Sequence, residues 1–185
     1  MTSVFILSAD MDRFEWFHPN DAESRDILVC RKGLLESIPD RPIPIQIGGN
    51  EGEVSDFPQL DFSTPCMSKY AWDRLRGLIE TDVQLIPVSR ADGAVYYAIN
   101  VLRVVDCFMR DKSRFSIRPL FESTDYGYIS AIYEYGLDMS KLGDAAIFKI
   151  PEMVGREVYV TDVFKNTVES NGLTGFCFRR IYRTT

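Results

Sequence analysis

Asp10 and Asp12 are the first residues in this chain whose types and spacing could do chemistry, because they form a D-x-D pair just after a predicted strand. Such a pair can hold a divalent cation, which prefers hard oxygen ligands. A single pair is a weak signal, and acids in a solvated loop account for it without a metal. Asp56 and Asp61 add nothing more specific. An enzyme acting through carboxylates would need Asp10, Asp12 or Asp106 to converge with a second acid.

His18 is the only histidine, and it lies in the segment Trp16–Pro19, which we interpret as a loop. A triad with a histidine base could use only this residue, and no G-x-S-x-G elbow is present to pair with it. Lys112 and Ser113 could be drawn as a nucleophile pair, but neighbours on an extended chain point to opposite faces. A capping serine beside solvated charges is the simpler interpretation. We predict no catalytic, metal-binding or cofactor-binding residue, and we expect that the protein is not an enzyme.

The glycine-rich segment Gly48–Gly52 is the remaining motif of this kind. It lacks the Gly-Lys-Ser/Thr of a P-loop and the glycine spacing of a dinucleotide-binding fold. It therefore predicts a turn, and the surrounding Gly48–Pro58 stretch is the best candidate for a boundary in the chain.

The net charge limits the classes of partner. The 185 residues include 21 basic and 27 acidic side chains, which gives a formal net charge of −6. An acidic surface repels phosphate backbones, so nucleic acid is not an expected partner. The same charge favours a basic protein partner through electrostatic steering, although a modest net charge also simply keeps a domain soluble.

The cysteines and the apolar runs predict a compartment. The four cysteines show no CxxC spacing, and they are Cys30, Cys66, Cys107 and Cys177. Reduced cysteines buried in the core are typical of a reducing, intracellular environment, so we expect a cytoplasmic protein. The first residues lack the basic region and cleavage site of a signal peptide. No apolar run approaches 18 residues, so we expect no contact with a membrane.

The elements that must position any site centre on Val83–Ser113, which predicts a β-hairpin. Asp92-Gly93 supplies the turn, because both residues tolerate a positive φ. The arm Val95–Val105 is apolar on both faces, which is typical of a central strand covered on both sides. Arg103 interrupts this arm and is expected to have a partner or to lie at the end of the sheet.

Two helices flank the predicted strands. Ser68 is expected to cap a helix that runs to Glu80, and Thr161 or Asp162 to cap a second one that stops at Asn171-Gly172. Arg13–Arg25 is predicted to be a loop, and Arg179–Arg183 a solvated tail. Further strands are predicted at Val4–Leu7, Ile27–Cys30, Ile43–Ile47, Arg114–Leu120, Ile129–Tyr135, Ala145–Ile150, Val158–Val160 and Phe176–Arg179.

These elements predict an α+β fold with a mainly antiparallel sheet and a few helices packed on it, because strict βαβ alternation is absent. A chain of this length suits one domain over residues 1–185, within which residues 1–60 could form a small N-terminal subdomain.

The order of the elements and several short motifs resemble those of the Imm11 family, also described as DUF1629, of bacterial immunity proteins. The matching motifs are mostly core and cap residues, and the resemblance covers roughly Pro65–Ile181. They are Tyr96-Tyr97, Asn100-Val101-Leu102, Val105-Asp106, Ser113, Ile147-Phe148, Val160-Thr161-Asp162 and Gly172-Leu173-Thr174-Gly175-Phe176.

The resemblance implies a cytoplasmic protein that is encoded beside a polymorphic toxin and neutralises it in the producing cell. It implies no catalytic residues, so we expect a non-enzymatic, toxin-binding protein whose contact residues and oligomeric state are unknown. Acids at Asp10-Asp12, Glu51–Glu53 and Asp56 are the first places to look for a rim that attracts a basic toxin. The alternative is a small-molecule-binding or regulatory module, in which Gly48–Gly52 would be a lid over a closed apolar pocket.

Overall fold

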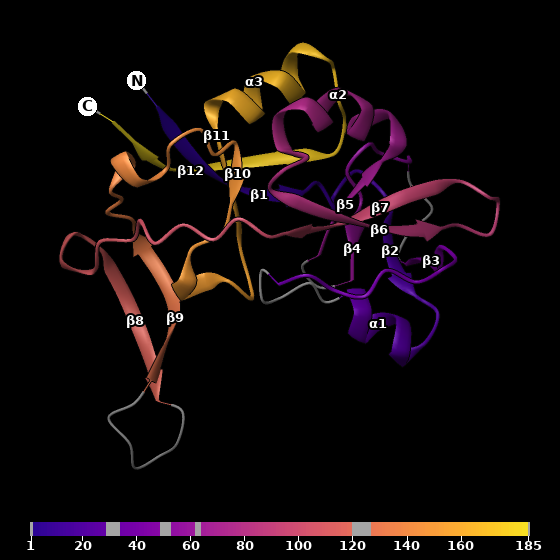
Figure 1. The fold of residues 1–185 in the computed structure, drawn as a ribbon, viewed down its shortest axis with the longest axis horizontal. Helices are drawn as coiled ribbons and strands as arrows, with labels where there is room; N and C mark the ends of the chain where they lie inside the picture. Colours follow the sequence, from indigo (N-terminus) through magenta and orange to yellow (C-terminus); the bar gives the residue numbers. More distant parts are fainter. Residues whose placement is uncertain (1, 29–33, 49–52, 62–63, 120–126, 185) are drawn as a thin grey trace.

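The fold is built mainly from strands, which form three groups (Figure 1). The computed structural model describes residues 2–28, 34–48, 53–61, 64–119 and 127–184. The strands are β1 (Ser3–Ala9), β2 (Trp16–Pro19), β3 (Ile43–Gly48), β4 (Gln59–Leu60), β5 (Thr64–Ser68), β6 (Val83–Ser89), β7 (Val95–Val101), β8 (Arg114–Pro119), β9 (Gly127–Glu134), β10 (Ile147–Phe148), β11 (Val158–Thr161) and β12 (Phe176–Arg183). The helices are α1 (Ala22–Leu28), α2 (Lys69–Ile79) and α3 (Asp162–Ser170), with 3-10 turns η1 (Arg110–Lys112), η2 (Met139–Lys141) and η3 (Pro151–Met153). None of the helices in these ranges is long and apolar enough to cross a bilayer.

Six of the described strands close into a barrel in the order β2, β3, β6, β7, β5, β4. Most neighbours in it are antiparallel, whereas the β2–β4 and β3–β6 pairs are parallel. Alternate side chains point inward, as closure of a small barrel requires. They form an apolar cluster that includes Phe17, Ile43, Ile45, Leu60, Cys66, Ile86, Val88, Tyr96 and Ala98.

Strand β7 is central, as the sequence predicts, because it pairs with β6 on one side and β5 on the other. Tyr96 and Ala98 point into the barrel, whereas Ile99 and Val101 join the core beneath the helices. The turn between β6 and β7 is also confirmed: Gly93 takes a φ of 86°, and its N–H donates to the carbonyl of Arg90.

The predicted arm ends earlier than expected, at Val101 rather than Val105. The N–H groups of Leu102 and Arg103 both donate to the carbonyl of Asp82, which turns the chain out of the sheet. Arg103 has the partners that burial requires, since its guanidinium contacts the carboxylates of Asp82 at 3.3 Å and Asp144 at 2.9 Å.

The open sheet has the order β10, β11, β1, β12, and all its pairs are antiparallel. Helices α2 and α3 lie side by side over one of its faces (Figure 1, top). Successive side chains of β1 point to opposite faces. Phe5 and Leu7 therefore pack under the helices, whereas Val4 and Ile6 join a second core around Phe148.

Both main helices begin where the sequence predicts. The Oγ of Ser68 accepts a hydrogen bond from the N–H of Ala71, so Ser68 caps α2. Thr161 is the N-cap residue of α3, although its side chain makes no capping hydrogen bond. Gly172 takes a φ of 62°, which fits the predicted stop after Asn171.

The predicted α+β class needs correction, because the structure is β-rich and the antiparallel sheet is accompanied by a barrel. The loop predicted at Arg13–Arg25 contains β2 and most of α1, and the strand predicted from Ile27 is wrong because Ile27 and Leu28 end α1. Cys30 lies outside the described residues. Strands β4 and β5 were not predicted as strands. The strands that the sequence does not predict, β2, β4 and β5, are short, so few alternating residues indicate them. Closure of the barrel stabilises them.

Two predicted boundaries near the C-terminus are also wrong. Of the strand predicted at Ala145–Ile150, only Ile147–Phe148 pairs as a strand, with Lys149 in an isolated bridge to Val104. Arg179–Arg183 is not a solvated tail, since it continues β12 against β1. Of the first sixty residues, β1 contributes to the open sheet and β2, β3 and β4 to the barrel. The division of the chain into domains stays a prediction.

We predict that Val101→Asp unfolds the protein. Val101 is 0% exposed and lies opposite Val83, so the carboxylate would be buried without a partner. That costs several kcal/mol, which is comparable with the whole stability of a domain. Thermal unfolding followed by circular dichroism would measure the loss. Val95→Asp is the matched control on the same strand, because Val95 is 40% exposed and should tolerate the charge. A Val101→Asp protein that melts with the wild type would show that β7 is not central.

Candidate functional site

The acidic pair after β1 lies at the surface. Asp12 is exposed and Asp10 half-buried, and the N–H of Asp10 donates to the carbonyl of Gly175. Burial, together with the carboxylates of Asp10 and Asp12, raises the pKa of the Cys177 thiol. Asp106 lies instead beside Lys141, whose Nζ donates to its carbonyl. Within the described ranges, no three His, Cys, Asp or Glu side chains are grouped closely enough to hold a metal ion.

Asp56, one of the acids expected in a binding rim, is used inside the fold. Its Oδ1 accepts from the Ser68 hydroxyl at 2.9 Å, and its Oδ2 accepts from the N–H and hydroxyl of Thr174 at 3.0 and 3.1 Å. Its carbonyl accepts from the N–H of Ser68. Asp56 therefore fastens the loop before β12 to the start of α2. Of the other rim candidates, Glu53 is exposed and Glu51 lies outside the described residues.

His18 lies on β2 rather than in a loop. Its Nδ1 is 3.3 Å from the side-chain nitrogen of Gln46, its cross-strand neighbour, and its ring packs near Trp16. Asp61 has a φ of 49° and pairs with Arg25 at 3.1 Å. The contacts of His18 with Gln46 and Trp16 place it on the outer face of the barrel, and neither of these two partners is a nucleophile.

Ser113 holds together the base of the β8–β9 hairpin. Its hydroxyl donates to the carbonyl of Met109 at 2.6 Å and accepts from the N–H of Gly136 at 2.9 Å. The chains approach closely here, because a Cβ at Gly136 would lie 2.7 Å from the carbonyl oxygen of Lys112. Ser113 is thus a structural residue, and the exposed Lys112 beside it is not part of a nucleophile pair.

Tyr135, Glu157 and Tyr159 form a cluster in the second core. The two tyrosine hydroxyls have the most strongly shifted pKa values among the ionisable groups of that core. Both tyrosine hydroxyls donate to Oε2 of Glu157 at 2.8 Å. Burial is the main cause that raises the pKa of both hydroxyls, and the Glu157 carboxylate adds to it. The hydroxyls therefore stay protonated as donors and cannot act as bases at neutral pH.

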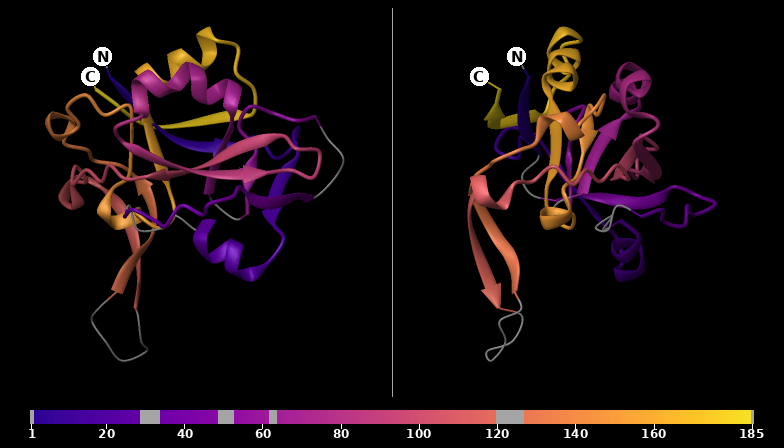
Figure 2. Two further views of the ribbon diagram at one scale, coloured as in Figure 1. Left: turned by 45° about the vertical axis from the view of Figure 1, so that its right-hand side comes forward. Right: turned by 60° about the vertical axis from the view of Figure 1, so that its left-hand side comes forward.

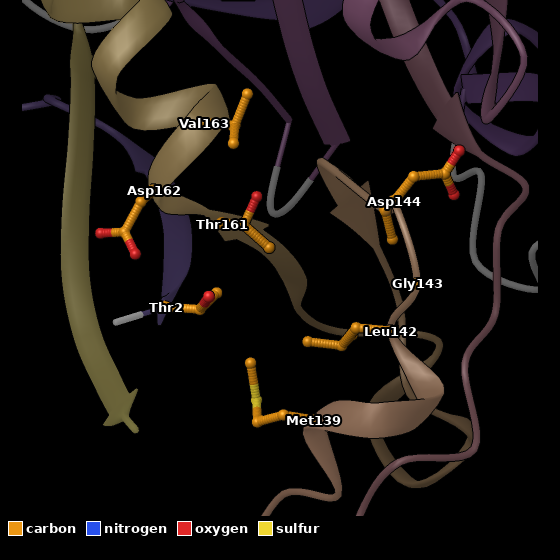
Figure 3. Close-up of a pocket in the computed structure, with 9 residues that line it drawn as sticks. Thr2, Met139, Leu142, Gly143, Asp144, Thr161, Asp162 and Val163 are labelled. Carbon is orange, nitrogen blue, oxygen red and sulfur yellow. The ribbon is translucent and has the colours of Figure 1, made fainter. Parts of the chain in front are cut away.

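A cavity of about 300 Å³ opens between η2 and the start of α3 (Figure 3). Met139, Leu142 and Thr161 line it, while the carboxylates of Asp144 and Asp162 point to opposite sides, away from the space between them. Both acids are engaged, because Asp144 pairs with Arg103 and Asp162 accepts from the N–H of Ser3. These two carboxylates therefore do not converge on the cavity as the polar groups of a ligand site would.

A second cavity, of about 360 Å³, lies beside β3 and the β6–β7 turn. Arg90 lines it, but its guanidinium is shared between Glu15 at 3.5 Å and Asp92 at 3.2 Å. Of the lid expected at Gly48–Gly52, only Gly48 lies within the described residues. Neither cavity supports the small-molecule alternative.

The β8–β9 hairpin is the surface that sequence reasoning missed. It extends away from the rest of the structure, as Figures 1 and 2 show. Ile129 and Ile132 anchor it in the second core, whereas Tyr128 and Tyr133 are 37% and 58% exposed. Two tyrosines and three arginines lie exposed on the hairpin or beside it, and we call these five side chains the arm face. The arm face consists of Arg114, Arg118, Tyr128, Tyr133 and Arg156.

Contacts between side chains hold the arm face in place. The guanidinium of Arg156 lies over the ring of Tyr128 at 5.5 Å, and that of Arg114 lies over Tyr133 at 5.2 Å. The Ser116 hydroxyl contacts the Ser130 hydroxyl at 2.8 Å and accepts from the Tyr133 hydroxyl at 3.4 Å.

Two irregularities in pairing explain why the sequence hid this surface. The register shifts between Arg114 and Phe115 and again between Ser116 and Ile117, so Tyr133 and Ser130 have no residue opposite them on β8. Such bulges bend a strand and redirect its side chains. They also interrupt the two-residue alternation, so no polar face could be recognised in Ile129–Tyr135. The remaining signal in the sequence is that Arg114–Pro119 contains two arginines and Gly127–Glu134 two tyrosines.

The structure thus defines a β-rich protein in which Asp56 and Ser113 hold internal contacts and which displays a projecting Tyr/Arg surface. The chain belongs to the immunity protein family Imm11, whose family model matches residues 4–183. The match extends the resemblance seen in the sequence to most of the first sixty residues. A comparison with curated proteins finds no match.

We predict that Asp56→Ala destabilises the fold by about 2–3 kcal/mol, because three donors lose a charged acceptor. Chemical denaturation would measure the free energy of unfolding. Asp12→Ala, which removes an exposed acid, should change it by less than about 0.5 kcal/mol. Equal stability of Asp56→Ala and wild type would contradict the structural role and return Asp56 to the list of binding residues.

We also predict a loss of stability at alkaline pH. The folded state keeps the Tyr135 and Tyr159 protons that the unfolded chain releases near pH 10. The free energy of unfolding therefore keeps its full value below about pH 10. Above that pH it falls by about 1.4 kcal/mol per pH unit for each hydroxyl. Urea unfolding at about pH 8 and about pH 11 should show a shallower fall for Tyr135→Phe. Tyr133→Phe, at an exposed neighbour, should keep the wild-type fall, and equal falls in all three proteins would refute the assignment.

Proposed function

We propose that this protein is an immunity protein that binds a cognate toxin and neutralises it stoichiometrically, without catalysis, in the cytoplasm of the cell that makes the toxin. The observation that carries the proposal is membership of the immunity protein family over residues 4–183. Neutralisation by binding requires a stable surface that covers or distorts the toxin's site, and it requires no reactive group on the immunity protein.

The environments of the polar groups support binding over catalysis. Asp56, Ser113 and Glu157, which could otherwise be proposed as reactive groups, each accept hydrogen bonds from neighbours in the fold. Groups engaged in this way stabilise the scaffold, and a scaffold is what a binding protein must supply. Rigid scaffolds lose less conformational entropy on association, which favours high affinity.

The proposal predicts rescue and a fixed stoichiometry. Co-expression with the product of the neighbouring toxin gene should restore growth, and the two proteins should purify together. Titration of the purified protein into the toxin's activity assay should reach full inhibition at about one equivalent, because a binder is consumed as it acts.

Each alternative outcome has a distinct meaning. Full inhibition at a small fraction of one equivalent would show that immunity is enzymatic. No rescue together with no complex would refute the proposed function. A catalytically inactive toxin serves as the control, since it should still form the complex.

A further inference from the structure

The arm face combines the residue types that carry most of the energy in protein interfaces. Tyr and Arg are enriched among such residues, because they bring a large contact area and several donors at low entropic cost. Here they keep part of their surface open to a partner, since Tyr128 is 37% and Tyr133 58% exposed. On the opposite face of the same strand, Ile129 and Ile132 pack in the second core.

The charge of the arm face is opposite to that of the whole chain. The net charge of the protein is −6, whereas the arm face holds three arginines. Among the residues that the structure describes, only Arg114 of the three pairs with a carboxylate, that of Glu134 at 2.8 Å, and this pair is exposed. Arg118 is exposed and makes no ion pair with any residue in the described ranges, and Arg156 is held by the Ser130 carbonyl and the Tyr128 ring.

The arm face is also preorganised. Ser113 and Gly136 fix the base of the hairpin, and the two stacked Arg–Tyr pairs hold their side chains in place. Side chains that are already ordered lose little entropy when a partner arrives. Since the hairpin stands away from the body (Figure 2), its exposed face can enter a concave surface without a clash from the barrel.

We propose that the arm face is the surface that docks on the toxin and that it receives an acidic segment of the toxin. This inference rests on the proposed function and adds to it the location of the contact and the chemistry of the partner. Carboxylates of the partner would accept bidentate hydrogen bonds from guanidinium groups such as that of Arg118. The net charge of the whole protein would instead favour a basic partner. The charge of the toxin surface that is bound therefore distinguishes docking by the arm face from docking by an acidic rim.

The test compares the arm with a matched Arg–Tyr pair elsewhere. Tyr70 is 50% exposed on α2, and the guanidinium of Arg74 lies 3.2 Å from the centre of its ring. The arm variant combines Arg118→Glu with Tyr128→Ala, and the control variant combines Arg74→Glu with Tyr70→Ala. Calorimetry would measure the affinity of each for the inactive toxin, and thermal melting would verify the fold.

We expect the arm variant to bind about 30-fold more weakly or worse, and the control to stay within about twofold of wild type. Arg118→Gln, which removes the charge without adding a new one, should weaken binding about tenfold and covers the case in which the double variant fails to fold. The affinity of the wild type should fall between about 50 mM and about 500 mM NaCl, and that of Arg118→Gln should fall less.

Four outcomes would overturn the inference. Tighter binding by the arm variant or by Arg118→Gln would show a basic epitope, and unchanged binding by the arm variant would place the contact elsewhere. Binding of a labelled RNA or DNA duplex in competition with the toxin would show that the arm face takes phosphate. A wild type that neither binds nor protects would refute the proposed function itself, and the docking inference with it.

Discussion

The structure depends on one constraint: the open sheet is apolar on both faces, so both must be covered. Strand β1 shows it most directly, since Phe5 and Leu7 face the helices while Val4 and Ile6 face the second core. A strand with polar residues at alternate positions would remove the apolar side chains against which one of these cores packs. The helices α2 and α3 cover one face, and side chains that include Val105, Phe108, Ile132 and Leu142 cover the other. The barrel joins this arrangement through β7, whose inner and outer residues belong to different cores.

This double coverage decides where the molecule can bind a partner. The residues that link the layers, such as Asp56 and Arg103, satisfy partly buried backbone and side-chain groups. Using them for a partner would leave those groups unpaired, which costs more than a surface contact returns. The hairpin β8–β9 is less constrained, because only its inner side chains are needed by the second core. Its outer side chains are therefore available for a function that the fold does not determine.

The elements that could be predicted from the sequence are those whose local signals agree with their tertiary role. Ser68 begins α2, Asp92-Gly93 turns the β6–β7 hairpin, and the apolar run from Val95 to Val101 forms a central strand. The barrel could not be predicted, since β4 has two residues and β2 four, and such strands exist only because their neighbours close the ring. The arm face could not be predicted either. The two register shifts between β8 and β9 disrupt the alternation of side chains by which the two faces of a strand are recognised in a sequence. In addition, Arg156 joins the arm face from a different segment of the chain.

Hydrogen–deuterium exchange on the complex with the toxin tests the central claim most directly, because it reports where the contact lies without altering a residue. The account predicts that amides of β8 and β9, the latter including Tyr128 and Tyr133, exchange more slowly when the inactive toxin is bound. Amides around Tyr70 on α2 should exchange at the same rate with and without the toxin. Slower exchange at Asp10–Asp12 and Glu53 with an unchanged hairpin would contradict the account and favour an acidic binding rim.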